Sequence, residues 1–177
     1  MKKGMLDRAI ERVAKGHTDA LEDIYTQTSS AVYSYVLSIV RNTEDAEDIL
    51  QDTYVKVYLN AAQYQSQGKP MAWILTIARN LSLMKLRAGK RVAELAEYEW
   101  ENIVDESAGF KTEDRMVLQA ALSGVSDEES QIVILHAVAG LKHREIADML
   151  DMPLATVLSK YNRALKKMRN IIEGNKR

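Results

Sequence analysis

A hydroxyl, an amide and a guanidinium group lie close together near the end of the chain, on Ser159, Asn162 and Arg163. Arginine can pair bidentately with guanine and asparagine with adenine, so these side chains could read base edges in a DNA major groove. Residues 156–169 hold five basic residues and no acidic one. Basic side chains bind phosphates, which fixes the register of a protein on DNA. The chemistry predicted for this segment is therefore DNA recognition.

The elements that would position these side chains form a helix-turn-helix. A helix over 143–150 is predicted to turn its apolar residues inward, and residues 151–153 form the turn. A second helix opens with Pro153, which suits a first helical turn. Its inward residues recur at helical spacing: Val157, Tyr161, Ala164, Leu165 and Met168. The alternative interpretation is a solvated face on an ordinary helical hairpin.

Charge is unevenly distributed, although the net charge is only −1. Residues 79–91 hold a second group of five basic residues without an acid, whereas residues 44–52 hold five acids without a base. Residues 94–114 hold eight acids and one lysine. This pattern suggests a polyanion bound at two places and a protein partner bound elsewhere.

The sequence predicts an all-α protein, because apolar residues recur with a helical period and no segment alternates like a strand. Helices are expected over 5–15, around 21–25, around 33–40, from Thr43 to about Asn60 and from Pro70 to near Gly89. Thr18 and Thr43 are predicted N-caps. Further helices are expected over 116–122 and 127–139, and Ser126 with Glu129 forms a predicted capping box. These helices divide into two small domains, residues 1–91 and 115–177, joined by an acidic linker over 92–114.

Several kinds of site are not expected. The chain has no cysteine, which excludes disulfides and thiol chemistry. Its three histidines, His17, His136 and His143, show no metal-ligand spacing, so neither a metal nor a cofactor is predicted. No Gly-rich phosphate loop or nucleophile–base pair is visible. No apolar run is long enough to span a membrane.

Three segments together resemble the extracytoplasmic-function (ECF) group of sigma-70 RNA polymerase sigma factors. Residues 45–54 (DAEDILQDTY) are similar to its polymerase-binding helix. Residues 72–81 (AWILTIARNL), with Lys85, Leu86 and Arg87, are similar to its −10 helix. Residues 140–147 (GLKHREIA) and 153–159 (PLATVLS) are similar to its −35 helix-turn-helix. Met84 stands where an aspartate is usual and Leu158 where a basic residue is usual, which leaves the preferred promoter sequence open.

The resemblance implies a sigma-2-like domain followed by a sigma-4-like helix-turn-helix domain. Core polymerase would bind the residues Asp45, Asp48, Gln51 and Asp52. The −10 element would be recognised and melted by Tyr64, Gln65, Ser66, Asn80, Lys85, Arg87, Lys90 and Arg91. In the family, the loop containing Tyr64 holds a base flipped out of the opened strand. The −35 element would be contacted by Arg144, Thr156, Ser159, Lys160, Asn162, Arg163 and Lys167.

The partners implied are core RNA polymerase, through its beta-prime clamp helices and beta flap, promoter DNA and a cognate anti-sigma factor. The chain itself would not be an enzyme, because the polymerase performs the chemistry. Its expected location is the bacterial cytoplasm, free or held at the membrane through an anti-sigma factor, with a role in stress response. A stand-alone helix-turn-helix regulator of transcription remains the alternative, but it leaves residues 45–54 and 73–81 unexplained.

Overall fold

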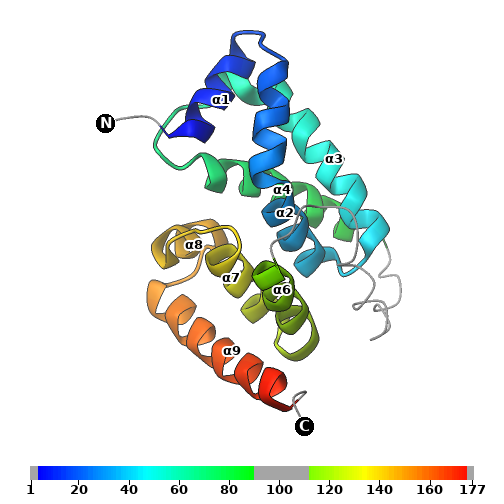
Figure 1. Cartoon of the computed structure of the whole chain (residues 1–177), viewed down its shortest axis with the longest axis vertical. Coiled ribbons are helices and arrows are strands. Elements are labelled where there is room, and N and C mark those ends of the chain that lie inside the picture. Colours follow the sequence, from blue (N-terminus) through cyan, green and yellow to red (C-terminus); the bar gives the residue numbers. More distant parts are fainter. Residues whose placement is uncertain (1–3, 90–111, 175–177) are drawn as a thin grey trace.

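The protein is all-helical across the residues that its structure, a computed structural model, describes: 4–89 and 112–174 (Figure 1). This part of the chain contains eight α-helices, one 3₁₀ turn (η1) and no strand. The first group of elements is α1 Met5–Ala14, α2 Asp19–Val40, α3 Thr43–Asn60, η1 Ala61–Gln63 and α4 Pro70–Ala88. The second group is α6 Thr112–Gly124, α7 Asp127–Ala137, α8 His143–Leu150 and α9 Leu154–Gly174. The predicted fold class is confirmed.

Residues 19–40 form one helix, α2, where the sequence predicted two. The polar stretch between the predicted helices contains neither glycine nor proline, so nothing breaks the helix there. Thr28 lies in this stretch and is buried; its hydroxyl lies 2.6 Å from the Ile24 carbonyl and 2.7 Å from the Tyr54 hydroxyl. Its polar group is therefore satisfied inside the helix packing, and the prediction of two helices was wrong.

Side chains cap the starts of α3 and α7. Asn42, rather than the predicted Thr43, caps α3, because its side-chain oxygen accepts a hydrogen bond from the Asp45 N–H at 2.9 Å. Thr18 stands at the N-cap of α2 but makes no side-chain cap bond. The predicted capping box of Ser126 and Glu129 is confirmed at the start of α7.

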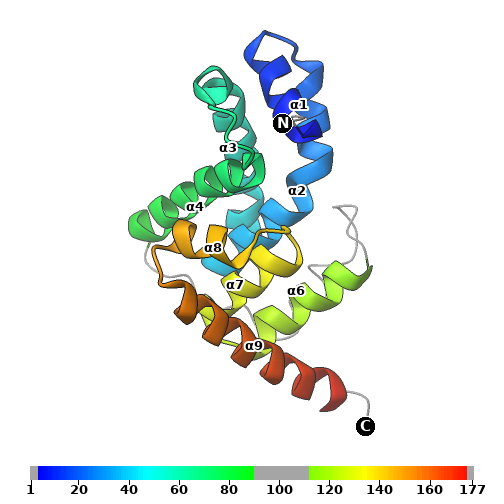
Figure 2. The ribbon, with the colours of Figure 1, turned by 90° about the vertical axis from the view of Figure 1, so that its left-hand side faces the viewer.

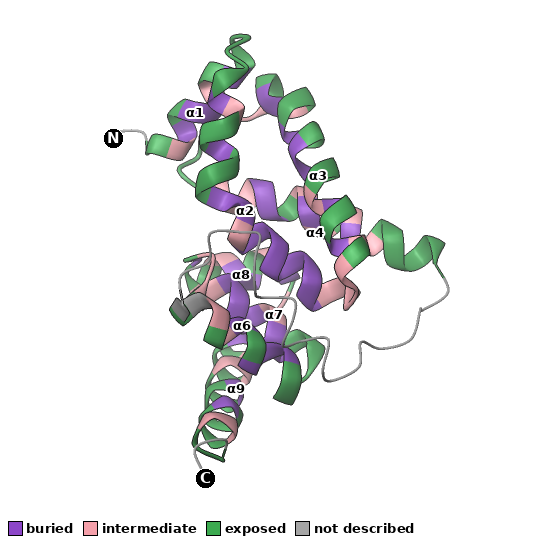
Figure 3. Cartoon of the chain, turned by 45° about the vertical axis from the view of Figure 1, so that its right-hand side comes forward, coloured by how far each residue is buried: buried purple, intermediate pink, exposed green. Residues whose placement is uncertain are grey.

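The two groups of helices pack against each other. Helix α2 contacts α7, and α4 contacts α8, so the second group sits beneath the first in Figure 1 and beside α4 in Figure 2. Buried residues of both groups form one continuous core. Figure 3 shows the C-terminal half of α2 buried on nearly all sides, and residues 31–38 are all buried. This half of α2 is therefore covered by both groups of helices.

Helix α6 begins at Thr112, inside the predicted linker. The rest of that linker, residues 92–111, lies outside the described residues, as do Lys90 and Arg91. Among described residues, no helix is both long and apolar enough to cross a membrane.

Candidate nucleic-acid and polymerase interfaces

The predicted helix-turn-helix is present in the structure. Its first helix, α8, runs from His143 to Leu150, as predicted. Asp151 ends this helix with φ 52°, a left-handed conformation that aspartate tolerates better than most residues. Ile146 and Leu150 of α8 and Val157 of α9 are buried, and the two helices contact each other. Helix α9 starts at Leu154, one residue after the predicted start, and the Pro153 carbonyl accepts its first hydrogen bonds. The turn thus fixes how α9 projects from the core.

Helix α9 buries a narrower stripe than predicted. Val157, Ala164 and Met168 are buried and Tyr161 is half-buried, but Leu165 is 38% exposed. At 100° per residue, Leu165 lies about 80° around the helix from Val157, at the edge of the stripe. The prediction that Leu165 faces inward was therefore wrong.

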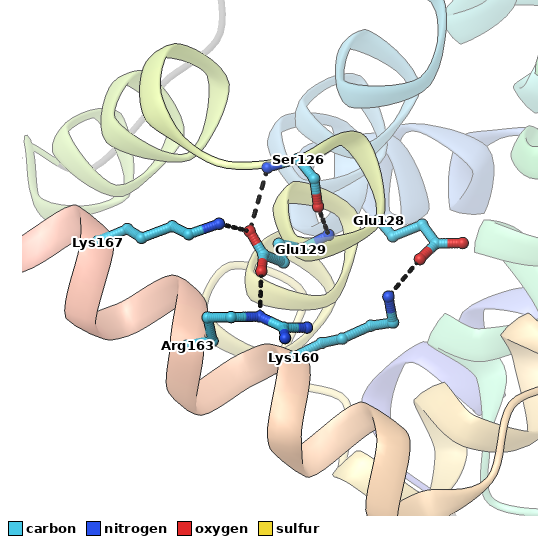
Figure 4. A network of polar contacts seen from close by, with 6 residues as sticks. All are labelled: Ser126, Glu128, Glu129, Lys160, Arg163 and Lys167. Carbon is cyan, nitrogen blue, oxygen red and sulfur yellow. Dashed lines mark hydrogen bonds and ion pairs between the residues drawn. The ribbon is translucent and has the colours of Figure 1, made fainter.

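Most of the predicted −35 contacts lie on the surface. Arg144, Ser159, Asn162, Arg163 and Lys167 are exposed, whereas Thr156 and Lys160 are half-buried. The three basic residues of this set on α9, Lys160, Arg163 and Lys167, also contact helix α7 (Figure 4). Lys160 Nζ lies 2.5 Å from a Glu128 carboxylate oxygen. Contacts with acidic residues of α7 therefore restrict the positions of these side chains.

Glu129 is the centre of this contact between α7 and α9. Its Oε1 accepts a hydrogen bond from Arg163 Nε at 2.7 Å, and its Oε2 accepts one from Lys167 Nζ at 2.8 Å (Figure 4). Burial acts to raise the pKa of Glu129, but hydrogen bonds from Lys167, the Ser126 N–H and Arg163 outweigh it and lower this pKa to about 2. The sequence signalled the capping role of Glu129 and gave no sign of these two distant partners.

A second cluster joins α7 to the two helices of the helix-turn-helix. His136 and His143 stack with ring centroids 4.1 Å apart, and Tyr161 packs edge-on against both rings. A His136 ring nitrogen, Nδ1, lies 2.7 Å from the Leu141 carbonyl oxygen. Burial and the neighbouring His136 lower the pKa of His143. The fold thus brings together two histidines that showed no relation in sequence; among described residues, no group of side chains suited to holding a metal was found.

The acidic helix α3 exposes three of its four predicted polymerase-binding residues, Asp48, Gln51 and Asp52. Asp45 instead lies 3.0 Å from Lys85 Nζ, a predicted −10 contact on α4, and this hydrogen bond and charge raise the pKa of Lys85. The exposed face of α3 continues into apolar residues that the sequence analysis missed: Val55 is 55% exposed and Leu59 is 62% exposed. Their helical spacing from Asp48 and Asp52 places all four on one face.

The loop before α4 is anchored to α1. Tyr64 and Ser66 both donate their hydroxyl hydrogens to Asp7 Oδ1, at 2.6 and 3.0 Å, and Asp7 is buried. Burial and the Asp7 carboxylate raise the pKa of the Tyr64 hydroxyl. The Tyr64 ring packs on Trp73 with centroids 4.8 Å apart. Asp7 was missed because it lies 57 residues away from Tyr64.

An open pocket of about 480 Å³ adjoins this loop. Its walls include Tyr64, Gln65 and Trp73 on one side and, from α8, Glu145, Asp148 and Met149 on the other. Two further predicted −10 contacts, Asn80 and Arg87, are exposed on α4. The pocket therefore combines the aromatic rings of Tyr64 and Trp73 with the exposed amide of Gln65. The neighbouring surface of α4 is polar.

Sequence comparison adds two family matches. Residues 24–92 match the family described as sigma-70 region 2, and residues 115–168 match sigma-70 region 4. The chain is 28% identical over 182 residues to the ECF RNA polymerase sigma factor SigK of Mycobacterium ulcerans, covering 96% of this chain and 95% of the relative. It is also 28% identical over 177 residues to SigK of Mycobacterium tuberculosis H37Rv, covering 95% and 94%. A stand-alone regulator does not account for the region 2 match.

Two solved structures share the fold. CnrH, solved in complex with the cytosolic domain of CnrY, aligns with a TM-score of 0.61 at 19% identity, covering 95% of this chain and 97% of CnrH. RpoE of Bartonella quintana, solved with the anti-sigma factor NepR, aligns with a TM-score of 0.65 at 17% identity, covering 86% and 96%.

Proposed function

Since the chain belongs to the ECF group of the sigma-70 family of RNA polymerase sigma factors, we propose that it directs core polymerase to promoters through two separate DNA-binding surfaces. Residues 1–91 form the domain that binds core polymerase and recognises and melts the −10 element. Residues 115–177 form the domain that recognises the −35 element. The acidic segment between them, predicted as a linker over residues 92–114, would end where α6 begins at Thr112.

The −35 assignment is carried by the exposed polar face of α9 beside the helix-turn-helix. Ser159, Asn162 and Arg163 are the proposed base readers, because their side chains are exposed and match the donors and acceptors of base edges. The proposed phosphate contacts fix register without reading sequence. They are Arg144, Thr156, Lys160 and Lys167.

The −10 assignment is supported by the pocket beside the 64–67 loop. Capture of a flipped base needs stacking together with hydrogen bonds to the base edge. The Tyr64–Trp73 pair offers aromatic surface and Gln65 offers an amide. Ser66 and the Tyr64 hydroxyl hold the loop on Asp7. Further proposed contacts with the −10 DNA are Asn80, Lys85, Arg87, Lys90 and Arg91.

Core polymerase is the proposed partner of the exposed face of α3. Asp48, Gln51 and Asp52 would set encounter and orientation on the clamp helices, as charges near an interface rim do. Val55 and Leu59 extend this face with apolar area. Asp45, through its ion pair with Lys85, would mark the boundary between the polymerase surface and the DNA surface.

Strand opening by this protein would need no catalytic residue and no cofactor. Binding the opened strand more tightly than the duplex is enough to shift that equilibrium. The polymerase would perform the chemistry, and the sigma chain would choose the site.

An anti-sigma factor is a further proposed partner. CnrH and RpoE, which share this fold, were solved with a CnrY domain and with an anti-sigma factor. We place the chain in the bacterial cytoplasm, where core polymerase works, either free or held at the membrane through such a partner.

Promoter binding with and without core polymerase tests this function. We expect the chain alone to bind promoter DNA weakly and without a defined site, and the complex with core to protect both elements from cleavage. Equal, site-specific binding by the chain alone would instead identify a stand-alone regulator, whose affinity should fall steeply with salt.

A further inference from the structure

Glu129 lies between the −35 helix and the core with almost no access to water. Its side chain is 3% exposed, whereas Arg163, which donates to it, is 53% exposed. A buried carboxylate is costly unless charged or polar partners compensate it. Here the compensation comes from α9, through Arg163 and Lys167, and from the Ser126 N–H at 3.2 Å. The arrangement therefore ties the orientation of α9 side chains to α7.

Glu129 holds Arg163 through one particular nitrogen of its guanidinium group. The contact with Glu129 uses Nε, and in Figure 4 the dashed line to Arg163 reaches that nitrogen rather than the terminal ones. A guanidinium is a planar fork, so fixing Nε fixes the direction in which the terminal nitrogens point. Bidentate recognition of guanine O6 and N7 needs two donors held in one plane. Glu129 thus leaves a pair of donors available and restricts their orientation.

We propose that Glu129 is a positioning residue for −35 recognition: it holds Arg163 by Nε so that the terminal nitrogens of Arg163 meet a guanine edge. The proposal rests on the proposed base-reading role of Arg163. Lys167 shares the carboxylate through its other oxygen and serves phosphate binding. Glu128, whose exposed carboxylate pairs with Lys160, has no such role, because Lys160 is a flexible point charge.

The neighbouring residues provide matched controls. Glu129→Met keeps most of the side-chain volume and removes the acceptor for Arg163. Ser126→Ala weakens the same helix cap and leaves the contact between Glu129 and Arg163 in place. Glu128→Met removes an acid from the same helix turn without touching Arg163. Circular dichroism and an unfolding curve report whether each variant folds.

The experiment uses the full chain with core polymerase and promoters carrying every single-base change in the −35 element. Initiation rates give a discrimination ratio for each position. Arg163→Ala identifies the position that Arg163 reads. We expect Glu129→Met to lower discrimination at that position by about tenfold, within the range that one bidentate base contact contributes, and to leave ratios at the other positions unchanged. Ser126→Ala and Glu128→Met should leave the ratio at that position unchanged.

The double variant Glu129→Met with Arg163→Ala gives the decisive comparison. If Glu129 acts through Arg163, its replacement adds no further loss of discrimination once Arg163 is gone. An equal loss of initiation for all promoters that leaves the ratio at that position unchanged, or a loss of discrimination that adds to that of Arg163→Ala, overturns the positioning role. Arg163→Ala could leave every discrimination ratio unchanged while initiation still depends on the chain. That result would contradict the base-reading role of Arg163, and with it the positioning role of Glu129. If Glu129→Met does not fold, Glu129→Gln replaces it, with a smaller loss expected at the same position.

Discussion

Arg41 reaches from the end of α2 to the carbonyl oxygen of Leu122, 81 residues later in the chain, with Nη1 2.8 Å from that oxygen. Another of its nitrogens, Nη2, lies 3.0 Å from the Asp127 carboxylate. Arg41 itself has φ 54°, the left-handed conformation that ends α2. One side chain at a helix end therefore ties the region 2 helices to the region 4 helices.

Replacing Arg41 by alanine should destabilise the fold. A hydrogen bond involving a charged group contributes about 1.5–3 kcal/mol, and Arg41 is only 19% exposed. We expect a loss of this size in the free energy of unfolding by urea. Arg12→Ala is the control, because Arg12 is 46% exposed and pairs with Asp19 and Asp23 on the surface. Such pairs are worth about 0–1 kcal/mol, so equal losses for the two variants would contradict the role given to Arg41.

Reversing charge on α3 should weaken polymerase binding and spare the fold. Asp48→Lys combined with Asp52→Lys changes two exposed acids, so we expect an unchanged unfolding free energy and roughly tenfold weaker binding to core polymerase, mainly through slower association. Glu22→Lys, an exposed acid on α2, is the matched control. Unchanged affinity of the double variant in a binding titration would remove the polymerase role from this face.

Two substitutions in the 64–67 loop should have different effects, one on stability and the other on promoter opening. Tyr64→Phe removes a hydrogen bond to buried Asp7 and keeps the ring on Trp73, so we expect a loss of about 1–3 kcal/mol in unfolding free energy. Gln65→Ala changes an exposed pocket residue and should alter stability by less than about 0.5 kcal/mol. Promoter opening, followed by the reactivity of unpaired bases, should fall in Gln65→Ala. If opening proceeds normally in Gln65→Ala, the pocket does not take a base.

Acid should release the contact between Glu129 and α9. The pKa of Glu129 is lowered from 4.5 to about 2 in the fold. A lowered pKa means that the stabilisation is fully present above pH 4.5 and is lost as pH falls toward 2. The stability difference between the wild-type chain and Glu129→Met, measured at several pH values, should therefore shrink over this range. A difference that stays constant down to pH 2 would show that the carboxylate is not held in its charged form.

The histidine pair predicts a second pH dependence, nearer neutrality. The pKa of His143 is lowered by burial and by His136, so the neutral ring is favoured in the fold. The stabilisation is present above the ordinary pKa of 6.5 and is lost as pH falls below it. We expect the wild-type chain to lose thermal stability between pH 7 and 5, and His143→Phe, which keeps an aromatic ring against His136 and Tyr161, should remove part of that loss. Replacing exposed His17 should not; an equal effect of both changes would exclude the pair as the cause.

Local signals explain what the sequence predicted well. The bounds of α8, the end of α3 at Asn60 and the capping box at Ser126 follow from residues within a turn or two of each other. The polar stretch around Thr28 contains no helix breaker but misled the prediction, because the burial of Thr28 and its hydroxyl contact with Tyr54 depend on a helix distant in sequence. A local pattern does not contain that information.

In the candidate sites too, local features could be predicted and distant contacts could not. Sequence identified the residue types and the helices that carry them, but the partners of these residues are fixed by tertiary packing. Arg163 and Glu129 are 34 residues apart, and Tyr64 and Asp7 are 57 apart. Leu165 lies at the edge of the buried stripe of α9, where the helices packed against α9 decide whether a side chain is covered.

Transcription from a library of randomised promoters by bacterial core RNA polymerase, with and without this protein, tests the central claim most directly. Initiation that depends on the protein, from promoters sharing a −35 and a −10 pattern, is the predicted result. Selected promoters that lack either pattern, or no dependence on the protein although it is folded and the core is active, would contradict recognition through two surfaces.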